Sequence, residues 1–108
     1  MAIYIWKEED LELVKELPQQ VKEVINDNLI ILERHYGKER TEDDLGGYVV
    51  FLDEYNIELF KEEKLKGLTA EFIDDIKGAE YILSLFLLSC DFSIIVVCHK
   101  KLRHIIEG

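Results

Sequence analysis

The sequence contains little cysteine and proline, and each shortage excludes a class of protein. Its two cysteines, Cys90 and Cys98, are too few for the disulfide framework of a small secreted domain, so we expect a cytoplasmic protein. The N-terminus lacks the basic and long apolar regions of a signal peptide. Pro18 is the one proline, and the chain has no Gly/Ser-rich linker or low-complexity tract. These absences predict a single domain over residues 1–108.

Basic charge is also scarce, with 13 Lys and Arg against 23 Asp and Glu, a formal net charge of -10 and a pI near 4.7. Such a chain repels phosphate backbones and anionic membranes, so we expect neither direct nucleic-acid binding nor a membrane partner. Residues 39–80 hold 13 of the acids and 5 of the bases. This acidic middle predicts binding to another protein, a basic one, through Glu39, Glu42, Asp43, Asp44, Glu62 and Glu63. The alternative is that the charge serves only to keep the protein in solution.

Motifs that carry chemistry are missing as well. The glycines form neither a dinucleotide-binding fingerprint nor a phosphate-binding loop. The acidic run at 42–46 lacks the alternating oxygen ligands of a calcium loop, and His99, His104 and Glu107 do not have the spacing of a zinc site. Adjacent strand residues point to opposite faces, so His99 is not expected to activate Cys98. We therefore expect no catalytic residue, no metal and no cofactor.

The apolar pattern predicts alternating helices and strands. We expect a strand over 3–6, a helical stretch to Leu17, and a helix over 18–36 that ends at Gly37. A surface loop follows to residue 47, and then an interior strand over 48–52. Asp53 is expected to cap a helix over 54–66, and Thr69 a shorter helix before Gly78.

Residues 81–98 are nearly all apolar and long enough to cross a membrane. Asp91 would lie at the centre of such a span, so a β-hairpin over about 80–99, turning at Cys90 and Asp91, is the favoured structure, and a membrane anchor the alternative. A two-residue turn would place Leu83 opposite Cys98. Both faces of this hairpin are apolar and require cover from helices, from the C-terminal segment or from a second copy in a homodimer. The expected fold is α+β: a single compact domain with a small antiparallel or mixed sheet packed with helices.

Two functional hypotheses follow. The first is an acidic, non-enzymatic protein-binding module, of the inhibitor, antitoxin or immunity type, acting on a basic or nucleic-acid-processing partner. The alternative is a small enzyme or ligand-binding protein whose pocket is assembled from residues distant in sequence: Tyr48, Tyr81, His99 and Arg103.

Overall fold

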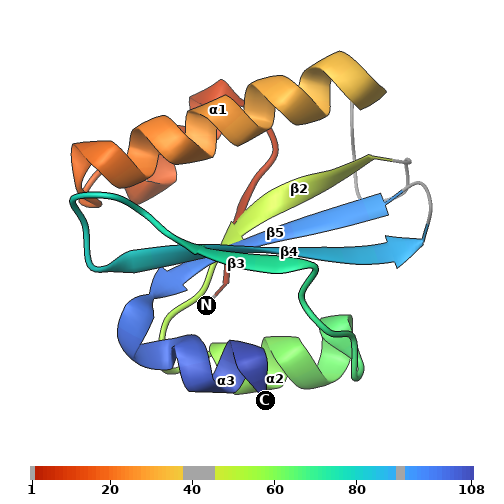
Figure 1. The fold of residues 1–108 in the computed structure, drawn as a ribbon. Coiled ribbons are helices and arrows are strands. Elements are labelled where there is room, and N and C mark those ends of the chain that lie inside the picture. The colour runs from red at the N-terminus through yellow and green to blue at the C-terminus, as the bar shows by residue number, and fades with distance from the viewer. Residues whose placement is uncertain (1, 38–45, 90–91) are drawn as a thin grey trace.

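The fold is built on a five-stranded mixed sheet, which the computed structural model describes together with its helices over residues 2–37, 46–89 and 92–108 (Figure 1). The strands are β1 (Ile3–Ile5), β2 (Gly46–Phe51), β3 (Phe72–Asp75), β4 (Tyr81–Ser89) and β5 (Phe92–His99), in the spatial order β1-β2-β5-β4-β3. β2 and β5 are parallel, and the other neighbours are antiparallel. The predicted α+β class is confirmed.

Helices cover both faces of the sheet, α1 (Gln19–Tyr36) on one side and α2 (Ile57–Phe60) with α3 (Arg103–Glu107) on the other (Figure 1). The 3-10 helix η1 (Glu8–Val14) packs beside α1. The π-helix η2 (Lys61–Leu65) continues α2, and the 3-10 helix η3 (Lys100–Leu102) leads into α3. The sheet is therefore the middle layer of three, and two apolar cores lie above and below it.

The predicted helix over 18–36 is present as α1, and it ends where the sequence indicates. Its buried residues recur every three or four positions, which is the spacing of one helix face: Val21, Ile25, Leu29 and Leu32. Gly37 adopts a φ of 97°, and its N–H donates to the carbonyl of Glu33. This left-handed residue ends the helix because few residues with a side chain adopt that backbone angle.

The predicted hairpin is also present, but its register differs by one residue from the expected one. Cys98 lies opposite Ile82 rather than Leu83, and the pairing shifts between Leu87 and Ser89. A bulge at this point adds one residue to β4. Each residue of β4 from Tyr81 to Leu87 therefore lies opposite a residue of β5 one position away from the expected one, and its side chain lies on the same face as that residue. Leu83 consequently shares a core with Ile95 and Val97 under α1.

Elements of the same chain cover most of the two faces of the hairpin, and Leu87 and Leu88 near the end of β4 remain exposed. One face packs under α1 and the other against α2, η2 and α3, as the two core clusters show. A homodimer was one of three possible covers for the apolar faces of the hairpin, beside helices and the C-terminal segment. The chain's own helices supply most of that cover, so a second copy is not needed to bury these two cores.

The expected helix after Thr69 is wrong, because β3 occupies this segment. Phe72 pairs with Leu85 and Asp75 with Ile82 of β4, in an antiparallel ladder. Ile73 packs into the core below the sheet, whereas Ile76 lies in the core above it. The apolar residues that suggested one helix face are therefore divided between two faces of a strand, and pairing with β4 overrides the local helical pattern.

Candidate functional site

The predicted binding residues lie in two parts of the chain. Glu39, Glu42, Asp43 and Asp44 fall outside the residues that the structure describes. Glu62 and Glu63 lie on η2, and both side chains are exposed. Glu62 also lines an open depression of about 670 Å³ between η2 and α3, which we call the η2–α3 groove. The other lining residues are Glu58, Lys61, Gly67, His104, Ile105 and Gly108.

Hydrogen bonds before α2 determine where this helix begins. The Asp53 carboxylate accepts the N–H groups of Tyr55 and Asn56, at 2.9 and 3.2 Å. Asp53 was predicted to cap a helix from residue 54, but these bonds form a turn and the regular helix begins at Ile57. Ile57 and Phe60 are buried and hold the helix against the sheet.

A wide helical turn over Lys61–Leu65 directs the glutamates outward. The N–H of Lys66 donates to the carbonyl of Lys61 at 3.0 Å, the five-residue spacing of a π-helix. Phe60 and Leu65 are both buried, although residues five apart in a regular α-helix point about 140° away from each other. The wider turn reduces that angle and returns Leu65 to the core. Isolated π-turns of this kind are frequent at functional sites.

The η2–α3 groove carries unpaired negative charge on one wall. Glu58 and Glu62 are four residues apart and line the same depression. Within the described ranges, neither carboxylate has an ion-pair partner. The side chain of Lys61, also on η2, crosses to the opposite wall, where its Nζ donates to the carbonyl of Ile105 at 2.7 Å. A cationic side chain entering the groove would meet two carboxylates and one ammonium, a net negative site.

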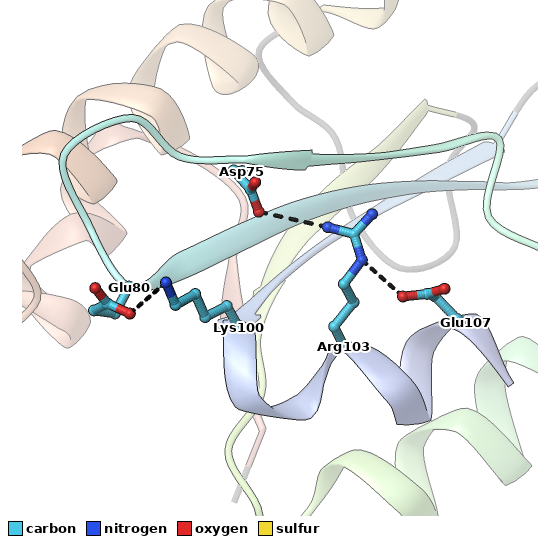
Figure 2. A network of polar contacts seen from close by, with 5 residues as sticks. All are labelled: Asp75, Glu80, Lys100, Arg103 and Glu107. Atoms are coloured by element: carbon cyan, nitrogen blue, oxygen red, sulfur yellow. Dashed lines mark hydrogen bonds and ion pairs between the residues drawn. The ribbon is translucent and has the colours of Figure 1, made fainter.

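The wall formed by α3 is tied to the sheet by ion pairs (Figure 2). Arg103 contacts Asp75 of β3 at 3.5 Å and Glu107 of its own helix at 2.7 Å. Lys100 pairs with Glu80 at 2.7 Å, and this hydrogen bond lowers the pKa of Glu80 and raises that of Lys100. Exposed pairs of this kind stabilise a fold only slightly. They occupy Lys100 and Arg103, whereas the burial of Leu102 and Ile106 in the core holds this end of the chain against the sheet.

The residues proposed for an assembled pocket do not converge. Tyr81 and His99 pair across β4 and β5 with their ring centroids 5.3 Å apart, and the Nδ1 atom of His99 accepts the N–H of Lys101. Tyr48 is buried and pairs with Ile94, which is five residues and about 17 Å from His99 along β5. Arg103 is occupied by its two ion pairs.

Cys98 is a core residue in this fold. It is fully buried, and burial raises the pKa of its thiol to about 12. It packs into the core below the sheet, whereas the adjacent His99 contacts Tyr81. The predicted separation of Cys98 and His99 thus agrees with the strand geometry, and the thiol stays protonated at neutral pH.

Neither a metal-binding cluster nor a membrane-spanning helix is present in the residues that the structure describes. Among them, no group of three or more His, Cys, Asp and Glu side chains could hold a metal ion. None of the helices in residues 2–37, 46–89 and 92–108 is both long and apolar enough to cross a membrane. In comparisons with known proteins, no family model, no curated protein and no solved structure matches the chain.

Glu62 was predicted from the sequence as a binding residue, but the groove around it was not. Glu58 lies one helical turn before Glu62 in the predicted helix over 54–66, and this spacing was the available signal. The opposite wall could not be found in this way, because His104 and Ile105 lie more than forty residues away along the chain, and only the fold brings them to η2.

Proposed function

We propose that this chain is a non-enzymatic protein-binding module that takes a basic segment of another protein into the η2–α3 groove. The observation that carries the proposal is the pair Glu58 and Glu62, which line one depression without an ion-pair partner in the described part of the chain. Two like charges held close together gain from a cation placed between them. An arginine or lysine side chain of a partner fits this requirement.

The charge of the whole chain supports the same partner chemistry. A net charge of -10 attracts a basic protein over distances longer than a direct contact and speeds the encounter. Inhibitors, antitoxins and immunity proteins that act on nucleic-acid-processing enzymes use this attraction, because the surface they cover binds a polyanion. Inhibition of such an enzyme is the most specific form of the proposal.

The test compares three tagged forms of the chain in a pull-down from the source cell. These are the unmodified chain, Glu58→Gln with Glu62→Gln, and a control pair with the same charge change, Glu9→Gln with Glu16→Gln, on exposed positions outside the groove. Captured proteins are identified by mass spectrometry at about 0.05 M and about 0.5 M salt, because screening weakens an electrostatic complex.

We expect a basic protein to be captured by the unmodified chain and by the control pair at low salt. The groove pair should bind this protein about tenfold more weakly, which corresponds to about 1.4 kcal/mol. If the groove pair and the control pair retain the same proteins equally well, the groove is not the binding site. If nothing is captured in a salt-dependent manner, the acidic charge only keeps the chain in solution.

A further inference from the structure

The strand β3 lies at the edge of the sheet. Its four residues pair with β4 on one side, and the spatial order of the strands places no described strand on the other side (Figure 1). An edge strand of this kind presents backbone groups that another chain can pair with.

The ladder between β3 and β4 shows which backbone groups point outward. The N–H of Ile76 donates to the carbonyl of Tyr81, directly after the register pair Asp75 and Ile82. Hydrogen-bonded and non-hydrogen-bonded pairs alternate in an antiparallel ladder, so Asp75 and Ile73 belong to non-hydrogen-bonded pairs. Their N–H and C=O groups therefore point away from β4, toward the free edge.

A depression runs along this edge between β3 and α1. It has a volume of about 300 Å³ and is lined by Val24, Asn28, Phe72, Asp74, Asp75, Ile76, Lys77 and Leu83. Phe72 is 42% exposed, so part of its ring is accessible at this depression. The Asn28 amide nitrogen donates to the carbonyl of Val24 at 2.8 Å, so the amide oxygen of Asn28 is left as an acceptor at the depression.

Side-chain alternation places two of the β3 residues on the side that faces α1. Phe72 lies opposite Leu85 and Asp74 opposite Leu83, and both leucines belong to the core under α1. On the other side, Ile73 packs into the lower core and Asp75 pairs with Arg103. Asp74 is exposed and has no ion-pair partner among the described residues. An apolar position and an acidic position thus lie two residues apart on one face of a free edge.

We propose that β3 binds an extended basic segment of a partner protein as a sixth strand of the sheet. The outward groups of Ile73 and Asp75 bond to the backbone of the added strand, a lysine or arginine lies opposite Asp74, and a branched or aromatic residue covers Phe72. This inference rests on the proposed protein-binding function and gives the partner a second contact, outside the η2–α3 groove.

Charge distinguishes this occupant from a second copy of the chain. In the two antiparallel registers that overlap most of β3 with a second copy, Asp74 faces either the Asp74 or the Phe72 of that copy. The first arrangement opposes like charges and the second covers an acidic side chain with an apolar one. Both copies also carry a large negative charge, so a basic strand is the better match.

The test uses the capped peptide TKTVTKT, in which lysine and valine alternate with threonine, so that one face presents the required pattern in either strand direction. Binding is followed in two-dimensional NMR spectra, which detect weak complexes, by the amide signal of Ile73 in every variant and by that of residue 75 wherever it is not proline. A second peptide, N-methylated at its threonines, keeps the charge but lacks the N–H groups that, in an antiparallel strand, would donate to the outward carbonyls of Ile73 and Asp75.

The decisive variants are Asp75→Pro and Asp75→Ala. Both lose the ion pair with Arg103, but only proline removes the outward N–H, and proline is tolerated on an edge strand. We expect Asp75→Ala to bind the peptide as the unmodified chain does, and Asp75→Pro to bind it at least tenfold more weakly. If Asp75→Pro fails to fold, Asp74→Lys serves instead. We expect this variant to bind TKTVTKT more weakly and to bind TETVTET, in which glutamate replaces both lysines, because the charges then match again.

Several results would overturn strand addition at β3: no binding of the peptide, equal binding of its N-methylated form, or binding that neither Asp75→Pro nor Asp74→Lys weakens. Dimers seen by sedimentation and abolished by Asp75→Pro would assign the edge to a second copy instead. The Glu58→Gln and Glu62→Gln pair should leave peptide binding at β3 unchanged. A failure of the edge, with capture that still depends on the groove, therefore refutes this inference alone.

Discussion

Replacement of Gly47 by alanine tests how closely the two central strands approach each other. Gly47 of β2 lies opposite Ser93 of β5 and has a φ of 129°, in the region that favours glycine. A Cβ atom at this position would lie 1.9 Å from the carbonyl oxygen of Ser93 and 2.8 Å from its carbonyl carbon. These are backbone atoms within the sheet, so the contact is relieved only if β2 and β5 separate.

The expected loss of stability combines two costs. The backbone angle costs a residue with a side chain about 1–3 kcal/mol, and overpacking in a well-packed interior costs about 1–3 kcal/mol more. We therefore expect Gly47→Ala to lower the free energy of unfolding by about 4 kcal/mol, a large share of the 5–15 kcal/mol or so typical of a domain. The assay is urea unfolding followed by the fluorescence of Trp6, which packs against Tyr48 with ring centroids 4.9 Å apart.

Gly67→Ala is the matched control. Gly67 has a φ of 77°, but a Cβ atom there has no heavy atom within 4 Å. Its substitution therefore carries the backbone cost alone, about 1–2 kcal/mol. If the two substitutions lower the free energy of unfolding by the same amount, the close approach of Gly47 to Ser93 contributes nothing and the reasoning is refuted.

Two further predictions concern titratable groups. Burial raises the pKa of the Cys98 thiol to about 12, so this thiol should react with a disulfide reagent at about pH 8 only in denaturant. The reaction is measured in a Cys90→Ser background, so that Cys98 is the one thiol present. Rapid labelling of the folded chain would contradict the burial. Because Lys100 lowers the pKa of Glu80, Lys100→Ala should raise that pKa toward 4.5 in an NMR titration, whereas Lys101→Ala, which removes a partner of Glu54 instead, should not. The stabilisation from the lowered Glu80 pKa is present above the usual glutamate pKa and is lost as the pH falls through the folded-state value.

The fold could be predicted to the extent that local patterns determine it. The spacing of buried residues in α1 and the glycine at its end identify that helix, and the two apolar runs joined by a short polar segment identify β4 and β5. The register of the hairpin could not be predicted in the same way. It depends on the bulge near Leu88, which no glycine, proline or other turn residue in the sequence indicates. One extra residue in β4 exchanges the side chains that face each side of the sheet along the rest of that strand.

The candidate sites were predicted less well than the fold, because each is assembled from distant segments. The sequence identifies Glu62 as an exposed acid, but the groove exists only where α3 returns to η2, with Lys61 bonded to Ile105. The edge at β3 was hidden by a helical pattern, since Phe72 and Ile76 are spaced as on one helix face. Pairing with the next strand, β4, decides this segment, and the helical spacing of its apolar residues does not show that pairing.

The cover on both faces of the sheet restricts where a partner can bind. The apolar composition of β4 and β5 suggested either a membrane anchor or a dimer interface, yet α1 on one face and α2, η2 and α3 on the other bury most of these residues, with Leu87 and Leu88 left exposed. Unpaired groups remain at the free edge of β3 and in the η2–α3 groove. Arg103 contacts Asp75 of β3 and Glu107 of α3, so ion pairs connect the edge strand to the helix that forms one wall of the groove. A partner that reaches both places would meet acidic side chains without an ion-pair partner in the described residues: Asp74 on the side of the sheet that faces α1, and Glu58 and Glu62 in the layer on the other side.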